Sequence, residues 1–108
     1  MNNDTTSVWE QELTPQFAAA LTAITDPTLM RAFLRDVMTE KEITEISARY
    51  EAARMLSSGE PYAAIIRRTR LSSRTVARIS DWLQNGAGGY TSVIANAHVS
   101  HISPEAAG

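Results

Sequence analysis

The chain has 108 residues, of which 44% are hydrophobic and none is cysteine. This length fits a single domain, and the absence of cysteine excludes disulfide frameworks and thiolate metal sites. No apolar run approaches the roughly 20 residues of a membrane span, and the N-terminus lacks the positive start and apolar core of a signal peptide. We therefore expect a cytoplasmic protein without a membrane partner.

The net charge of −2 conceals an uneven distribution. Residues 1–60 carry ten acidic and five basic side chains, whereas residues 61–84 carry five arginines and one aspartate. Contact with phosphate depends on local rather than net charge. The distribution therefore favours one basic face on an otherwise acidic protein.

A flexible arm and two helices are expected first. The arm covers 1–13, of which residues 1–12 are mostly polar apart from Trp9. Each helix then begins with an N-cap side chain followed by proline at the first helical position, in Thr14-Pro15 and in Asp26-Pro27. Apolar residues recur at helical spacing after both starts. The pattern predicts helices that end near residues 25 and 37.

A long helix is predicted over 39–58. Thr39 and Glu42 have the spacing of a capping box, in which each side chain accepts from the other residue's backbone N–H. Gly59 fits the position just beyond the helix, where a left-handed backbone is favoured. Apolar residues recur through the segment at the helical period, so we expect it to be the scaffold for the others.

The segment 61–84 is typical of two short helices joined by a turn. The first covers 61–69, and Arg70-Leu71-Ser72 breaks the pattern. Ser73 is expected to cap the second helix. Its apolar residues recur at i, i+3 and i+7: Val76, Ile79 and Leu83. This is the helix-turn-helix arrangement, in which the second helix enters the DNA major groove.

A short final helix and a flexible tail are expected after this segment. Asn85 and the glycines that follow end the second helix, and apolar residues between 90 and 97 favour one more helix. The tail covers 98–108. His98 and His101 have a spacing that fits one helix face, but no third ligand is evident, so we expect no metal site.

From about Phe33 to Ile94 the sequence resembles the Trp repressor family, and within it the YerC/YecD-like branch. The resemblance rests on TEKEI at 39–43, RYEAARML at 49–56 with Gly59, and SSRTVARI at 72–79. It implies an all-α fold of about six helices, with 14–97 as a single helical domain in an intertwined homodimer. Two recognition helices would then meet successive major grooves of double-stranded DNA.

The resemblance also identifies the positions of a ligand pocket, since the repressor proper binds tryptophan as its corepressor. The matching positions here are Arg49, Thr75 and Arg78. The two small residues expected near the ligand are replaced by Ile79 and Trp82, whose side chains would fill the space that an indole needs. We therefore expect neither tryptophan binding nor a cofactor.

Two residues of the helix-turn-helix depart from the family pattern. Arg70 occupies the turn position usually held by glycine, and a left-handed arginine costs about 1–2 kcal/mol. Ile66 occupies a position where a small residue normally lets the first helix pack closely on the second. We expect a helix pair that is more splayed than usual, or one that the dimer holds in place.

Candidates for DNA contact gather at the turn and the start of the second helix. Arg74 is the leading candidate for base reading, because arginine bonds guanine O6 and N7 bidentately and the first residues of a recognition helix lie nearest the base edges. Arg78 is expected to contact phosphate, or to pair with Asp81 or Glu51. The other candidates contact phosphate or flank Arg74: Arg67, Arg68, Arg70, Ser72, Ser73, Thr75 and Ala77.

The sequence predicts a homodimeric, sequence-specific transcriptional regulator. Two alternatives remain open: a protein-interaction adapter that keeps the fold without specific DNA reading, and the helix-turn-helix part of a recombinase whose catalytic domain lies on another chain. Arg70, Ile66 and the acidic remainder of the chain motivate the adapter. No Ser/His/Asp set, glycine-rich phosphate loop or isolated acid pair indicates catalysis, so we do not expect an enzyme.

Overall fold

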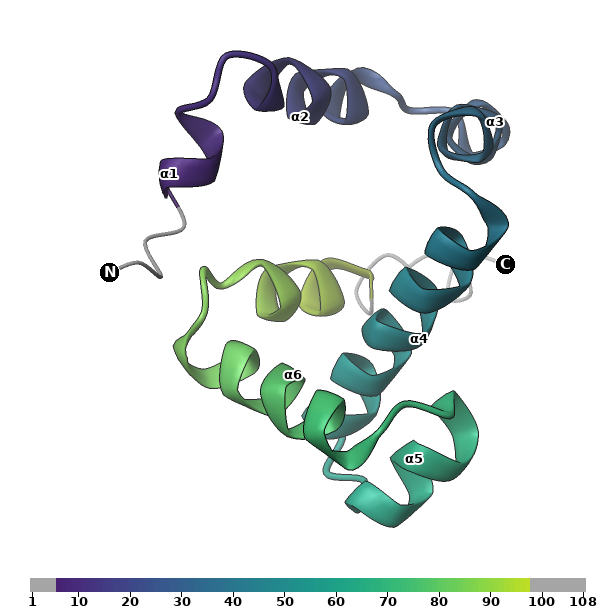
Figure 1. Ribbon diagram of the computed structural model, residues 1–108, viewed down its shortest axis with the longest axis vertical. Helices are drawn as coiled ribbons and strands as arrows, with labels where there is room; N and C mark the ends of the chain where they lie inside the picture. Colours follow the sequence, from purple (N-terminus) through teal and green to yellow (C-terminus); the bar gives the residue numbers. More distant parts are fainter. Residues whose placement is uncertain (1–5, 98–108) are drawn as a thin grey trace, which may run out of the picture. The chain divides into compact units, whose positions relative to one another are not determined.

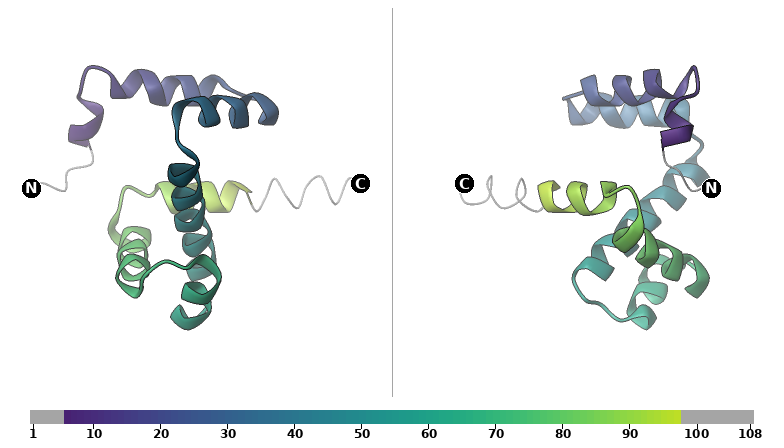
Figure 2. Two further views of the ribbon diagram at one scale, coloured as in Figure 1. Left: turned by 45° about the vertical axis from the view of Figure 1, so that its right-hand side comes forward. Right: turned by 90° about the vertical axis from the view of Figure 1, so that its left-hand side faces the viewer.

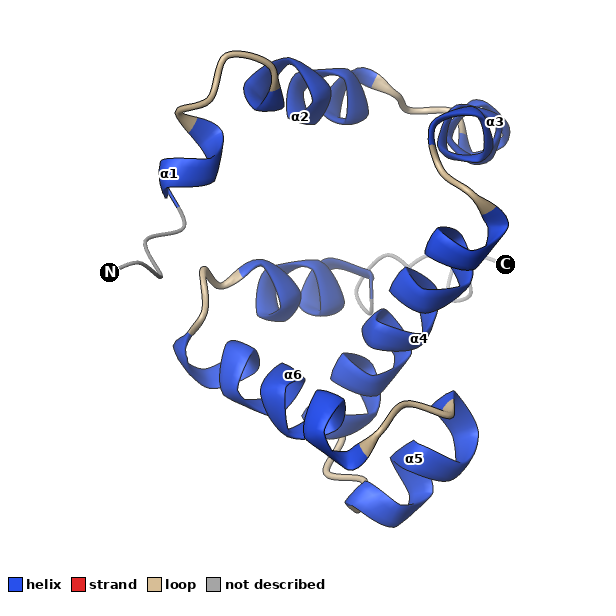
Figure 3. Cartoon of the chain, viewed as in Figure 1, coloured by secondary structure: helices blue, strands red, loops and turns tan. Residues whose placement is uncertain are grey.

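The computed structural model describes residues 6–97, and this part of the chain contains helices and loops but no strand (Figure 1, Figure 3). The predicted all-helical fold is confirmed. None of the helices in this part is both long and apolar enough to cross a membrane. A helical stretch over 89–97 follows the labelled helices, which are α1 (Thr6–Trp9), α2 (Thr14–Ala23), α3 (Pro27–Val37), α4 (Glu40–Ser57), α5 (Tyr62–Thr69) and α6 (Ser73–Asn85).

Contacts divide the chain into two units, Met1–Ile43 and Thr44–Gly108. The first contains α1, which lies within the segment predicted as an arm, together with α2 and α3. The predicted cap of α3 is confirmed, because the Asp26 carboxylate accepts the Leu29 N–H at 3.2 Å. The predicted cap of α2 is wrong: Leu13 holds that position, and the Thr14 hydroxyl instead donates to the Val8 carbonyl.

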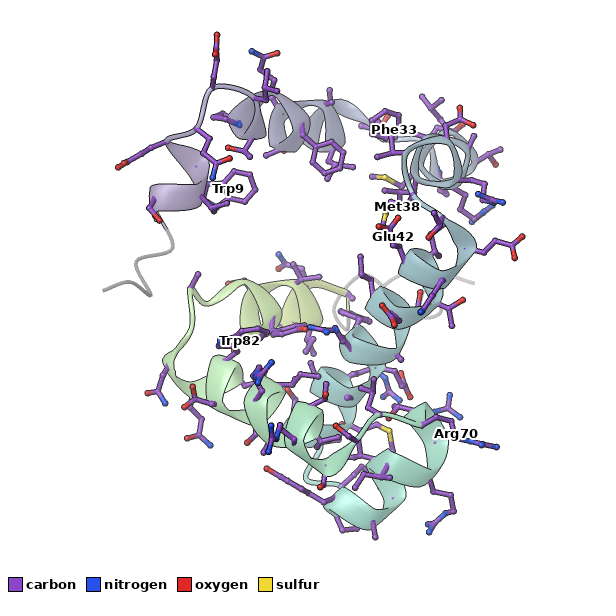
Figure 4. All side chains as sticks on the ribbon, in the orientation of Figure 1. Trp9, Phe33, Met38, Glu42, Arg70 and Trp82 are labelled. Carbon is purple, nitrogen blue, oxygen red and sulfur yellow. The ribbon has the colours of Figure 1, made fainter. Side chains whose placement is uncertain are left out.

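The first unit has no buried side chain among residues 7–43. Phe17 of α2 and Phe33 of α3 form an aromatic contact with ring centroids 6.1 Å apart, and Figure 4 labels Phe33 and the exposed Trp9. Leu13 is 72% exposed and Leu29 is 54% exposed. These helices therefore enclose no core of their own.

Both ends of α4 have the predicted capping arrangements. At its start the Thr39 N–H donates to the Glu42 carboxylate at 2.9 Å, and the Glu42 N–H donates to the Thr39 hydroxyl at 3.1 Å. At its end Gly59 has a left-handed φ of 84°. Its N–H donates to the Leu56 carbonyl, and the N–H of the next residue donates to the Met55 carbonyl, both at 3.0 Å. This pair of bonds is a Schellman motif, which satisfies carbonyls that the helix leaves free.

The core of the second unit lies where α4, α5 and α6 meet. Its six buried residues are Ala52, Ala53 and Met55 of α4, Ile65 of α5, and Val76 and Ile79 of α6. The two alanines present little side chain, so the backbone of α4 can approach the larger residues of the other helices closely. Tyr90 and Ile94 extend the core from the 89–97 helix, which Figure 2 shows beside α4 and α6. This core fixes α5 and α6 as one unit.

Candidate nucleic-acid interface

The turn between α5 and α6 depends on a left-handed arginine. Arg70 has φ 64° and ψ 13°, the positive φ anticipated at this glycine position, and its N–H donates to the Ile66 carbonyl at 2.8 Å. The Thr69 hydroxyl donates to the Ile65 carbonyl at 2.7 Å and accepts the Leu71 N–H at 3.3 Å. These bonds hold the turn in spite of the strain at Arg70, whose side chain extends outward from the end of α5 (Figure 4).

The contact between α5 and α6 is made by fully buried apolar side chains. Ile65 of α5 and Val76 and Ile79 of α6 are each 0% exposed. Ile66, the residue that departs from the family pattern, is half-buried and packs against this core. The bulky side chain at this position therefore contributes to the apolar contacts around the core.

The cap of α6 is Ser72 rather than the predicted Ser73. Ser72 is extended, with φ −71° and ψ 159°, and its hydroxyl accepts the Thr75 N–H at 3.1 Å. The same hydroxyl lies 3.0 Å from the Thr75 hydroxyl, to which it donates. The helix begins one residue earlier than predicted because the left-handed Arg70 reverses the chain at once, so that only Leu71 and Ser72 are needed to reach α6. The exposed Ser73 hydroxyl is left free of the cap.

Four of the five arginines are exposed and form no ion pair with another described residue. Arg74 and Arg78 lie one helical turn apart on α6, so their side chains share a face. Arg67, near the end of α5, and Arg70, in the turn, are likewise exposed. Within residues 6–97, none of these four forms an ion pair. Ala77, between Arg74 and Arg78 in sequence, is also exposed. The four arginines are called the basic surface of the helix-turn-helix, which runs in sequence from the end of α5 through the turn to α6.

The predicted pairing of Arg78 with Asp81 or Glu51 does not occur. The Asp81 carboxylate accepts from the Asn85 side-chain amide at 2.9 Å, four residues further along α6. Glu51 is occupied by arginines of α4 and α5 instead. Arg78 is therefore left available to a ligand in the part of the chain that the structure describes.

Arg68 differs from the other arginines because it pairs with Glu51 of α4. Its Nε donates to Glu51 Oε2 at 2.7 Å, while Arg54 donates through Nε and Nη2 to the two carboxylate oxygens at 2.9 and 2.7 Å. The hydrogen bonds from Arg54 and then from Arg68 lower the pKa of Glu51 to about 2, although partial burial raises it. The Arg54 contact was readable from its spacing of three residues, but the Arg68 contact spans 17 residues and has no local signal.

The family's ligand-pocket positions are distributed around the core. Ile79 is fully buried within it, whereas Trp82 is 43% exposed and lies between α6 and the 89–97 helix (Figure 4). Arg49 and Thr75 are half-buried, and Arg78 is exposed. A groove of about 580 Å³ between α4 and the 89–97 helix involves none of these five positions, and its lining residues are Tyr50, Arg54, Ser57, Ser58, Ile94, Ala95 and Ala97.

Metal ligands do not gather in the described part of the chain. No group of three or more His, Cys, Asp or Glu side chains there could hold a metal ion. The H-x-x-H pair, His98 and His101, lies outside the described residues.

The fold and the basic surface define an all-helical protein with a helix-turn-helix. The family model described as Trp repressor protein matches residues 12–98. The chain therefore belongs to the Trp repressor family, a family of DNA-binding transcription regulators. No curated protein is significantly similar to it in sequence.

Two solved structures share this fold. A TrpR-like protein from Eubacterium eligens is 28% identical, with a TM-score of 0.80 over 85% of this chain and 95% of that chain. A candidate Trp repressor from Staphylococcus aureus is 24% identical, with a TM-score of 0.78 over 85% of this chain and 92% of that chain. The second likeness concerns the fold alone.

Proposed function

We propose that this protein is a sequence-specific transcriptional regulator of the YerC/YecD-like branch that binds double-stranded DNA as a homodimer. The observation that carries the proposal is the set of exposed, unpaired arginines on the helix-turn-helix, of which Arg74 and Arg78 share one face of α6. Such a surface attracts phosphate, and α6 is the element that enters the major groove in proteins with this motif.

Within this surface Arg74 reads bases, since it is the second residue of α6 and its guanidinium suits guanine O6 and N7. The other side chains fix the protein on the DNA backbone. The free Ser73 hydroxyl and the N-terminus of α6, where backbone N–H groups point outward, add neutral donors for phosphate. Thr75 and Ala77 flank Arg74, and the remaining phosphate contacts come from Arg67, Arg68, Arg70 and Arg78. Ser72 supports this surface as the cap of α6.

The exposed apolar side chains of the first unit support the homodimer. Residues 7–43 contain no buried side chain, yet Leu13, Leu29 and Val37 are each half or more exposed. Burial of apolar surface contributes about 25 cal/mol per Å², so a partner that covers these helices would supply the stabilisation that they lack alone. A second copy would also place two α6 helices to meet successive half-sites of an operator.

The complete burial of Ile79 supports a regulator that does not respond to tryptophan. This side chain is fully buried among α4, α5 and α6, so the position is filled by the protein's own core. An indole could enter only by displacing Ile79 from close packing. The proposed regulator therefore does not use tryptophan. As a DNA-binding protein it acts in the cytoplasm, and the proposal includes no cofactor and no enzyme activity.

Selection from a random pool of double-stranded DNA with the purified chain tests this proposal. Enrichment of a two-fold-related sequence with half-sites about one helical turn apart is the expected result. Recovery of unrelated sequences at low salt would contradict sequence-specific reading. Failure to retain any DNA at high micromolar protein would favour the adapter, which keeps the fold without reading DNA.

A further inference from the structure

One arginine of the helix-turn-helix is held by a carboxylate on another helix. Arg68 of α5 contacts Glu51 of α4 through Nε alone, at 2.7 Å, and its side chain is 65% exposed. The terminal nitrogens Nη1 and Nη2 have no protein partner in the described part of the chain. Glu51 is only 22% exposed and is itself fixed by the two bonds from Arg54.

We propose that Glu51 is a positioning residue that holds the Arg68 guanidinium with its terminal nitrogens toward a DNA phosphate. This inference rests on the proposed function. A guanidinium has five donors in a rigid plane, so one edge can bind the carboxylate while the outer edge donates two bonds to phosphate oxygens. The first helix of a helix-turn-helix crosses the DNA backbone, which suits a phosphate contact from α5.

The negative charge of Glu51, taken alone, would weaken DNA binding, which is the opposite of what positioning of Arg68 does. A carboxylate beside the DNA-facing surface repels phosphate, so its removal would tighten binding if it did nothing else. Positioning works the other way, because an arginine already fixed by one bond loses less side-chain entropy when it binds phosphate. Two arginines share the single carboxylate, so the cluster of Glu51, Arg54 and Arg68 retains one net positive charge. The sign of the Glu51→Gln effect therefore separates the two roles.

The experiment is a double-mutant cycle on DNA affinity, measured by fluorescence anisotropy with the selected duplex at fixed salt. Glu51→Gln keeps the shape of the side chain and removes its charge. We expect it to weaken binding about three- to tenfold, since a lost contact of about 1 kcal/mol corresponds to this range. Arg68→Lys keeps the positive charge but cannot bind carboxylate and phosphate with a fixed plane, so we expect a similar loss. Combined with Arg68→Lys, Glu51→Gln should cause little further loss.

Glu45→Gln is the matched control, since it removes the same charge from an exposed position of α4 that has no ion pair within residues 6–97. We expect this variant to bind as the native chain does, or slightly more tightly. Thermal unfolding is recorded for every variant. If Glu51→Gln does not fold, the comparison of Arg68→Lys with Arg67→Lys carries the test, because Arg67 forms no ion pair among residues 6–97.

The outcomes separate this inference from the proposed function. Tighter or unchanged binding by folded Glu51→Gln, or additive losses in the cycle, would overturn the positioning role while DNA binding stands. Equal effects of Arg68→Lys and Arg67→Lys would overturn it in the same way. Absence of any DNA binding by the native chain would overturn both.

Discussion

Glu51 of α4 accepts the Nε–H of Arg68 on α5 at 2.7 Å, although the two residues are 17 positions apart. The bond joins the scaffold helix to the first helix of the helix-turn-helix outside the apolar core. It also means that one of the five arginines on this segment is oriented by the protein itself.

The acid dependence of stability should report this cluster. The pKa of Glu51 is lowered from 4.5 to about 2, so the ionised carboxylate stabilises the fold above pH 4.5, and this contribution is lost as the pH falls from 4.5 through 2. Urea unfolding of the native chain and of Glu51→Gln, followed by circular dichroism across this range, measures it. The native chain should lose more stability than the variant as the pH falls. Parallel losses would show that the pair contributes nothing.

The left-handed Arg70 predicts a stabilising substitution. Glycine adopts φ 64° without the Cβ strain that arginine bears, so Arg70→Gly should raise the free energy of unfolding by about 0.5–1 kcal/mol after the added freedom of the unfolded chain is subtracted. Arg70→Ala keeps the Cβ and serves as the control, with no gain expected. The same glycine variant should bind DNA more weakly, because it removes a cation from the basic surface. A destabilised glycine variant would contradict the assigned strain.

Ser72 caps α6 and Ser73 does not, so we expect substitutions of the two serines to affect stability differently. Ser72→Ala should lower the free energy of unfolding by about 1 kcal/mol, because the Thr75 N–H loses its acceptor. Ser73→Ala, at the first helical position, should leave stability nearly unchanged. Denaturant titration of the two variants measures both losses in the free energy of unfolding. A larger loss for Ser73→Ala than for Ser72→Ala would identify Ser73 as the cap.

Tryptophan should not bind, because Ile79 is fully buried at a position where an indole would need space. Isothermal titration of the native chain with L-tryptophan should give no heat of binding. The same titration of Ile79→Gly shows whether removal of the side chain opens the position. Micromolar binding by the native chain would refute the filled pocket.

Local signals accounted for much of the fold. The capping box at Thr39, the Asp26 cap and the glycine at the end of α4 each depend on residues within a few positions, and all three are present. The cap of α6 was misplaced by one residue because Ser72 and Ser73 are adjacent and either hydroxyl suits the position. The cap of α2 was misplaced because Leu13 holds that position without a side-chain hydrogen bond. Thr14 is instead engaged by the carbonyl of Val8, which sequence spacing does not indicate.

The side-chain partners at the site were not predicted from the sequence. The run of arginines predicted a basic surface, but it could not separate Arg68 from the others, since its partner Glu51 lies on another helix. Nor could it show that Arg78 stays unpaired while Asp81 is engaged by Asn85. The Glu51–Arg68 pair follows from how α4 and α5 meet in the fold, whereas the Asp81–Asn85 bond is a local contact within α6.

The most direct test of the central claim is the affinity of the native chain and of Arg74→Ala for the selected duplex and for random duplex, over a range of salt concentrations. We predict that the native chain prefers the selected duplex and that Arg74→Ala removes about 1–3 kcal/mol of this preference. Arg67→Ala, the control for a phosphate contact, should weaken both duplexes equally and reduce the salt dependence. Equal affinity of the native chain for both duplexes, unaffected by Arg74→Ala, would contradict the claim that this helix-turn-helix reads DNA sequence.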